Sequence, residues 1–173
     1  MDPIAPLARA LHDRSVRFAL IGVAGANYYA HAGSVVFTTK DRDLFLPLDA
    51  QNLVTCWAAC EAVGFNLWSE GEPLDQPRDR WLAERIIERR ALTSATGRDL
   101  DVDLALVMKG YDFEAVWNER RTFKLEGVDT PVARLLHIVT SKHALGRDKD
   151  RLFLATHREA LEQLLRREAR DPR

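Results

Sequence analysis

Apolar positions along the chain switch between helical and strand spacing, which predicts short helices and strands in close succession. Residues 4–13 place apolar side chains three and four apart and predict a first helix. Residues 16–21 form a β-rich apolar run that ends at Gly22, which predicts a strand. Gly25 and a helical stretch over residues 26–30 follow. This order of strand, glycine turn and helix suits either a close backbone approach to an anion or a tight turn without a ligand.

The next segment predicts a second strand over residues 35–48, followed by an amphipathic helix. Asp49 is a residue type favoured at helix N-caps, and Gly64 is expected to end that helix. Residues 65–68 predict a short strand. Residues 69–78 contain glycine, proline and acidic residues, so a mobile loop is expected there.

The middle of the chain predicts a short helix over residues 81–87 and a hairpin over residues 91–107. The turn of that hairpin is expected at Thr96-Gly97. A helix over residues 112–119 and a short strand over residues 122–126 are expected next.

Helical spacing dominates the last third of the chain. Pro131 is interpreted as the first position of a helix, where proline is favoured, and Gly146 is expected to end that helix. A last helix is predicted to open at residues 147–150. The charged tail, residues 166–173, is expected to fray.

The composition favours a folded intracellular protein. A length of 173 residues predicts one domain over residues 1–173, and a hydrophobic fraction of 46% supports a real core. A net charge of -1 gives the whole chain no general attraction for nucleic acid. Because no apolar run approaches the roughly 18 residues of a membrane helix and no secretory signal opens the chain, we expect a cytoplasmic protein. Cys56 and Cys60 are expected to be buried and reduced.

Candidate chemistry starts with Asp41 and Asp43. On a strand they point the same way, with Cα atoms roughly 6.6 Å apart at about 3.3 Å of rise per residue. Two such carboxylates can converge on a hard cation, most simply Mg²⁺, although two solvated acids at a strand entrance would give the same pattern. Asp99, Asp101 and Asp103 alternate strictly with apolar residues. Three acids on one strand face repel one another unless something cationic lies there.

These features together resemble the nucleotidyltransferase superfamily. The resemblance rests on Gly22 after an apolar strand, on Asp41 and Asp43 further on, and on a later strand acid near Asp103. The chain is most similar to the small bacterial minimal nucleotidyltransferases, including the AbiEii-type toxin and lincosamide-resistance branches. Lys142 followed by the basic turn at residues 146–150 is similar to a segment found downstream in many of them. The resemblance covers roughly residues 5–160.

The resemblance implies a fold and a reaction. The fold is an α/β (α+β) nucleotidyltransferase-like core over about residues 5–130, with a small mixed β-sheet flanked by helices, and C-terminal helices over about residues 131–170. The reaction moves a nucleoside monophosphate from an NTP such as ATP to a hydroxyl and releases pyrophosphate. Asp41, Asp43 and a third acid would hold Mg²⁺ or Mn²⁺ and carry the catalysis.

Two assignments within this resemblance are less direct. We select Asp103 as the third acid and the base because the residues after it repeat the pattern that follows Asp43; Asp101, on the same face, is the alternative.

The triphosphate is assigned to Gly22, Gly25, Lys142, Arg147 and Lys149. A lysine at residue 142 would also suit a solvated helix end.

The first turn departs from the family pattern, which has glycine or serine after the first glycine. Here Val23 follows Gly22, and valine offers no hydroxyl and blocks close backbone approach on its side. One hypothesis is therefore an active enzyme whose acceptor is a tRNA, a partner protein or a small molecule, and which belongs to a toxin–antitoxin pair. The other hypothesis is an inactive domain that binds nucleotide or a partner.

Trp68, Trp81 and Tyr111 are candidates to line an acceptor pocket, or they pack in the core.

Overall fold

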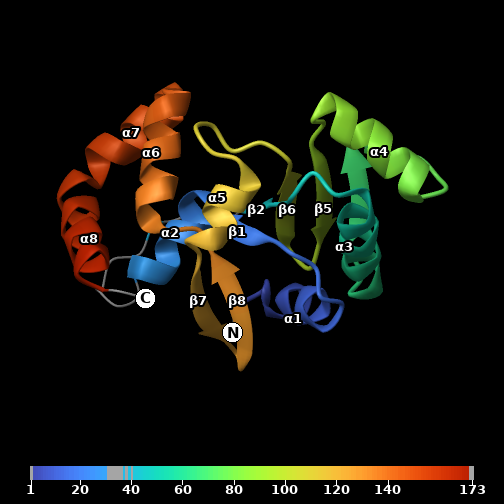
Figure 1. The fold of residues 1–173 in the computed structure, drawn as a ribbon, viewed down its shortest axis with the longest axis horizontal. Coiled ribbons are helices and arrows are strands. Elements are labelled where there is room, and N and C mark those ends of the chain that lie inside the picture. Colours follow the sequence, from blue (N-terminus) through green and yellow to red (C-terminus); the bar gives the residue numbers. More distant parts are fainter. Residues whose placement is uncertain (1, 31–36, 38, 40, 172–173) are drawn as a thin grey trace.

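The computed structural model describes residues 2–30, 37, 39 and 41–171, and in these it shows a mixed α/β fold with an eight-stranded sheet (Figure 1). The strands are β1 (Ala19–Ile21), β2 (Asp41–Phe45), β3 (Asn66–Ser69), β4 (Glu72–Pro73), β5 (Thr93–Gly97), β6 (Leu100–Ala105), β7 (Arg121–Leu125) and β8 (Val128–Val132). The helices are α1 (Ala5–Asp13), α2 (Gly22–Ala30), α3 (Ala50–Ala62), α4 (Arg80–Arg89), α5 (Phe113–Asn118), α6 (Leu135–Leu145), α7 (Asp148–Thr156) and α8 (Arg158–Arg170). The predicted α/β class, with a mixed sheet and C-terminal helices, is confirmed.

The strand order is β4-β3-β5-β6-β2-β1-β8-β7. Strand β2 lies between β1, which is antiparallel to it, and β6, which is parallel to it. This order brings two segments that are far apart in the sequence, β2 and β6, into direct contact at the centre of the sheet.

Two hydrophobic clusters cover the two faces of the sheet. Helices α1, α3 and α4 contribute to the first cluster, which includes Leu20, Leu44 and Val102. Helices α2, α5, α6 and α8 contribute to the second, which includes Ile21 and Phe45. Figure 1 shows α3 and α4 at one end of the sheet and α6, α7 and α8 together at the other. Side chains alternate along a strand, so every second residue of β2 faces the second cluster.

Several local predictions are confirmed. The carboxylate of Asp49 accepts a hydrogen bond from the Asn52 N–H at 3.0 Å and caps α3. Gly146 ends α6 in the left-handed conformation, with φ +62°. Cys56 and Cys60 are buried and free. In the described part of the chain, every helix is too short or too polar to cross a bilayer.

The hairpin of β5 and β6 turns later than predicted. Arg98 and Asp99 form the turn with φ +53° and +60°, and Gly97 is still paired with Leu100. Two consecutive positive φ values are typical of the turns that match the twist of a hairpin. Asp99 therefore lies in the turn, and only Asp101 and Asp103 lie on the strand.

The prediction that Pro131 begins a helix is wrong, because Pro131 lies inside β8, opposite Thr122 of β7. The two-residue turn at Glu126 and Gly127 makes Leu125 and Val128 the closing hydrogen-bonded pair. Pairs then alternate, so Thr122 and Pro131 form a non-hydrogen-bonded pair, where proline loses no bond to β7. Helix α6 begins only at Leu135.

The remaining differences concern the extent of elements. Strand β1 is shorter than predicted, and β2 spans only Asp41–Phe45; the earlier part of that predicted strand includes residues 35, 36, 38 and 40, which lie outside the described residues. The expected loop at residues 69–78 contains β4. The predicted last helix is two helices that meet at His157, and α8 continues to Arg170 instead of fraying from residue 166.

Candidate active site

The predicted acids meet where β2 and β6 run side by side. The parallel register pairs Asp43 with Asp103 and Asp41 with Asp101. Residues paired in this way project from the same face, so all four carboxylates lie on the face of the sheet that also carries Phe45. Asp43 and Asp103 are half-buried, whereas Asp41 and Asp101 are exposed at the edge of the cluster.

Gly22 makes room for the carboxylate of Asp43. Ile21, the last residue of β1, pairs with Asp43, and Gly22 follows it with φ +69°. A Cβ atom on Gly22 would lie 2.4 Å from Oδ2 of Asp43, which is closer than any real contact. A side chain at residue 22 is therefore excluded both by the backbone conformation and by the acid.

Among the acids of the cluster, Asp43 has a pKa that its surroundings raise. Burial raises the pKa of Asp43 to about 6, and the charges of Asp103 and Asp41 add to this rise. The charges of Lys142 and Lys149 act in the opposite direction and lower it in part. Two further carboxylates lie close to this half-buried carboxylate, so a bound cation would relieve the repulsion between their charges.

The structure distinguishes Asp103 from Asp101. The Ser94 hydroxyl, on the neighbouring strand β5, donates to Oδ1 of Asp103 at 3.1 Å. Asp101 lies two residues away on the exposed side, next to Asp41. Position and hydrogen bonding both support Asp103 as the third acid.

Lys142 and Arg147 lie on the cationic side of the cluster and share one buried acid, Asp150, which is 1% exposed. Arg147 donates to Asp150 from Nε at 2.6 Å and from a terminal nitrogen at 3.1 Å, and Lys142 Nζ lies 3.5 Å from Oδ1. Lys142 also lies over the ring of Phe153, 4.9 Å from its centroid. Asp150 thereby ties the end of α6 to the first turn of α7.

The pKa directions agree with this arrangement. Burial lowers the pKa of Lys142, and the charges of Asp150 and Asp43 offset part of that effect. Burial would raise the pKa of Asp150, but the hydrogen bond from Arg147 and the charge of Lys142 outweigh it and hold the pKa below its usual range. Asp150 also raises the pKa of Arg147, to which the charge of Asp43 contributes.

The two predicted glycines occupy different environments. Gly22 borders the acids, but Gly25 lies inside α2 and is buried. A Cβ on Gly25 would lie 3.0 Å from the Leu20 carbonyl oxygen and 3.1 Å from the Ile138 side chain, so this glycine allows α2 to pack closely. The chain enters α2 directly at Gly22, and Val23 is half-buried against the second cluster. The glycine turn expected over residues 22–25 is therefore the first part of α2.

The donor set fits a hard divalent cation. Asp41, Asp43 and Asp103 supply only carboxylate oxygens, and Gly22 leaves open the space that Oδ2 of Asp43 occupies. Over the described ranges, with gaps at residues 31–36, 38 and 40, no three acids, histidines or cysteines converge as closely as a bound ion requires. Like charges without a cation between them are expected to turn apart.

Sequence reasoning missed Asp150 and Ser94. Asp150 is three residues after Arg147 on a helix, a spacing that brings side chains together, but its burial could not be inferred from an exposed-looking charged turn. The pairing of Ser94 with Asp103 depends on the register of β5 and β6.

The three aromatic residues proposed to line an acceptor pocket lie in different surroundings. Trp68 donates from Nε1 to the Thr96 hydroxyl at 2.8 Å on the β3–β5 surface. Tyr111 packs on the ring of His137, with centroids 4.4 Å apart. Trp81 is 63% exposed on α4. A shared pocket made by these three residues is not observed.

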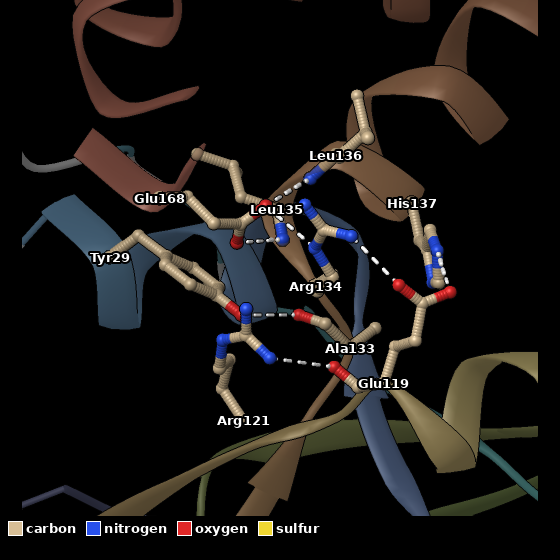
Figure 2. Close-up of polar contacts among 9 residues, drawn as sticks. All are labelled: Tyr29, Glu119, Arg121, Ala133, Arg134, Leu135, Leu136, His137 and Glu168. Atoms are coloured by element: carbon tan, nitrogen blue, oxygen red, sulfur yellow. Dashed lines mark hydrogen bonds and ion pairs between the residues drawn. The ribbon is translucent and has the colours of Figure 1, made fainter. Parts of the chain in front are cut away.

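A second buried carboxylate, Glu168 of α8, fixes the start of α6 (Figure 2). Its oxygens accept hydrogen bonds from Leu135 N at 2.7 Å, from Leu136 N at 3.1 Å and from Arg134 Nε at 3.3 Å. A carboxylate in this place satisfies backbone donors that have no partner inside the helix. The cap sets the position of α6 and hence of Lys142 further along it.

Comparison with known proteins supports the fold. The sequence matches no known family profile and no curated protein. The structure is similar to the crystal structure of ANT(2″)-Ia, an aminoglycoside nucleotidyltransferase, in complex with adenylyl-2″-tobramycin. The TM-score is 0.51 at 14% sequence identity, over 96% of this chain and 94% of that chain. The likeness shows a nucleotidyltransferase-like fold and does not single out the AbiEii-type branch.

Proposed function

We propose that the protein is a Mg²⁺-dependent nucleotidyltransferase that moves a nucleoside monophosphate from an NTP to a hydroxyl acceptor. The observation that carries this proposal is the parallel pairing of Asp43 with Asp103 beside Gly22. Three mutually repelling acids at the centre of a sheet destabilise the fold unless they serve a cation, and the nucleotidyltransferase-like fold is consistent with that use.

In this proposal Asp41, Asp43 and Asp103 hold Mg²⁺ or Mn²⁺, which neutralises the charge on the phosphate oxygens when it is bound. Lys142, Arg147 and Lys149 bind the triphosphate, because their charges all act on Asp43 and two of them are positioned by Asp150. The start of α2 adds backbone N–H groups next to Gly22.

The chemical step is a substitution at the α-phosphorus. The acceptor oxygen forms a bond to that phosphorus, the bond to the bridging oxygen breaks, and pyrophosphate leaves with the bonding electrons. The hydroxyl proton passes to Asp103, whose Oδ1 is held by Ser94 while the other oxygen is available as the base. Positioning and charge compensation supply most of the rate increase.

The acceptor is a tRNA, a partner protein or a small hydroxylated molecule. The similar solved structure holds adenylyl-2″-tobramycin, which is a nucleotidylated small molecule, and this motivates a small-molecule acceptor for the first assay. A partner-protein acceptor would suit a component of a toxin–antitoxin pair.

The test is transfer of label from each NTP, labelled on the α-phosphate, with Mg²⁺ or Mn²⁺ and with tobramycin, total tRNA or cell extract as acceptor. We expect label transfer and pyrophosphate release that disappear in Asp41→Ala and Asp43→Ala. Asp101→Asn is the matched control and should retain activity, whereas Asp103→Asn should lose it. Absence of transfer and of pyrophosphate release under every condition would overturn the proposal.

The second candidate is a domain that binds nucleotide without turnover. It is favoured by Val23, which is half-buried at the start of α2 and provides no hydroxyl beside Gly22. Calorimetry with a non-hydrolysable NTP distinguishes the two functions. Binding that survives Asp43→Ala in a protein that never releases pyrophosphate would support this candidate.

A further inference from the structure

A groove of about 700 Å³ runs along β7, on the side of the sheet edge that faces the end of α2 and the last turns of α8. Its lining includes five consecutive residues, 120–124, so the groove follows the edge of the strand and not one of its faces. This volume is within the range of pockets that bind ligands in proteins. Among the described residues that line the groove, none belongs to the acidic cluster.

In the part of the chain that the structure describes, the outer backbone edge of β7 is open toward this groove. Strand β7 is the last in the sheet order, and within the described residues it pairs only with β8. Because Thr122 and Lys124 occupy the non-hydrogen-bonded pairs of the hairpin, their N–H and C=O groups point away from β8. Two donors and two acceptors therefore face the groove at the spacing of a missing strand.

The floor of the groove is aromatic. Phe123 packs between Tyr28 and Tyr29, with ring centroids 5.6 Å and 5.2 Å apart. The hydroxyl of Tyr29 donates to the Ala133 carbonyl at 2.7 Å, as Figure 2 shows, so its polar group is already satisfied. These rings offer apolar surface to alternate side chains of an added strand.

The rim is cationic. Arg120, Arg121 and Lys124 come from the β7 side and Arg167 comes from α8. Among the described residues Arg167 makes no hydrogen bond or ion pair, whereas Lys124 pairs with Asp129 at 2.6 Å. The lining acids are Glu168, whose carboxylate is occupied at the start of α6, and Asp171.

We propose that this groove, the β7 groove, binds an acidic, extended segment of a partner protein, which adds to the sheet as a strand next to β7. The open backbone edge favours a polypeptide over RNA, because only a second strand can satisfy donors and acceptors in this alternation. The cationic rim favours acidic side chains. It disfavours a second copy of this chain, which would place two cationic rims face to face. The inference does not depend on the proposed catalytic function.

Fluorescence anisotropy with the full-length protein, without NTP, tests the proposal. The probe is a short labelled peptide that alternates Glu and Val; the controls are a Lys and Val peptide, the Glu and Val peptide with N-methylated backbone, and a labelled single-stranded RNA. We expect the first peptide to bind and the N-methylated form to bind about tenfold more weakly, because it cannot pair with a strand. Arg167→Glu should weaken binding, and added salt should do the same.

The sharpest variant is Thr122→Pro, which removes one outward N–H and leaves the β7–β8 bonds intact. It should weaken peptide binding by roughly five- to tenfold, while Thr122→Ala, which keeps the N–H, should bind like the parent protein. Hydrogen exchange of the Thr122 and Lys124 amides in the unmodified protein should slow when the peptide is added, a result that does not depend on any variant folding.

The proposal is overturned if the Glu and Val peptide does not bind or if its N-methylated form binds equally well. Tight RNA binding that Arg167→Glu abolishes and Thr122→Pro leaves unchanged would make the groove a nucleic-acid site instead. Concentration-dependent dimerisation that is lost in Thr122→Pro would make it an interface between copies.

Discussion

Buried or half-buried carboxylates occur in two regions of this molecule, and the charges around them are opposite in sign. At the centre of the sheet, Asp43 is surrounded by other acids and its pKa rises to about 6. At the start of α6, Glu168 is bound by two backbone N–H groups and by Arg134. Asp150 lies between Lys142 and Arg147, and these cations hold the pKa of Asp150 below its usual range. Like Glu168, Asp150 is therefore an acid whose charge is compensated by its protein neighbours.

The difference separates acids whose charge is compensated by protein groups from acids whose charge the protein leaves uncompensated. A buried carboxylate with donors on both oxygens stabilises the fold, because its lost hydration is replaced by protein groups. A buried carboxylate among like charges destabilises the fold until a cation arrives. Removing one acid from each region should therefore change stability in opposite directions.

The largest expected effect is that of Asp43→Asn on activity. In the proposed function this carboxylate is a metal ligand, so its loss should reduce nucleotidyl transfer by at least roughly 10³-fold by removing that ligand and part of the charge arrangement. At pH 7 the same variant should be more stable than the parent by roughly 2–3 kcal/mol, because a pKa raised from 3.8 to about 6 means that the charged form is disfavoured in the folded state. Label transfer and urea unfolding measure the two effects.

The two readouts act as mutual controls. A variant that loses activity and stability together would show that Asp43 is a structural acid like Glu168. Saturating Mg²⁺ should stabilise the parent protein against urea and leave Asp43→Asn unchanged.

Glu168→Gln should show the opposite sign and the largest loss of stability. The amide keeps one acceptor and turns an N–H group toward backbone donors, so we expect a loss of about 2–3 kcal/mol in urea unfolding. Glu162→Gln on the same helix is the matched control, because Glu162 is exposed and its partners among the described residues are Arg158 and Arg166. That change should alter stability by less than about 0.5 kcal/mol. Equal effects of the two changes would contradict a buried cap.

Much of the acidic centre could be predicted from local patterns. Strand alternation places Asp41 and Asp43 on one face, and the same rule places Asp101 beside Asp103. The resemblance to nucleotidyltransferases then predicted that acids from the two strands contribute to one site. Asp99 was misplaced because the turn could occur at either of two neighbouring dipeptides, and only the register with β5 decides between them.

Residues whose role depends on long-range contacts were not predictable. Pro131 favours a helix start locally, but the pairing of β8 with β7 places it in a strand. Asp150 and Glu168 look like surface acids of charged helices, and their burial results from packing between α6, α7 and α8. Gly25 looks like a turn residue and is a packing residue, because Ile138 of α6 lies against it.

Asp150→Asn should have an intermediate effect, through the two cations that it positions. In the proposed function Lys142 and Arg147 bind the triphosphate. Without the charge of Asp150 both cations are free to turn away from it, and we expect about a 10- to 100-fold loss in kcat/KM, mainly as a rise in KM for the NTP. Asp148→Asn is the matched control two residues earlier, because Asp148 is fully exposed and its ion pair within the described chain is with Arg151. A loss confined to kcat, or an equal loss in Asp148→Asn, would contradict the positioning role.

The smallest expected effect concerns His137, which lies beside the Glu168 cap. Burial lowers the pKa of His137 below 6.5, and the charge of Arg134 adds to this, although the charges of Glu119 and Glu168 oppose it. A histidine pKa that is lower in the folded state contributes stability above about pH 6.5, and this contribution is lost as the pH falls through the folded value.

His137→Phe keeps a ring against Tyr111 and removes the titrating group, together with the Nδ1 atom that has no partner. We therefore expect the stability difference between variant and parent to shift in favour of the variant as the pH falls from about 7 to 5. Urea unfolding at several pH values measures this difference. A stability difference that stays constant with pH would mean that His137 has the same pKa in the folded and unfolded chains. The groups around Glu168 would then stabilise the protonated form of His137 as well as water does.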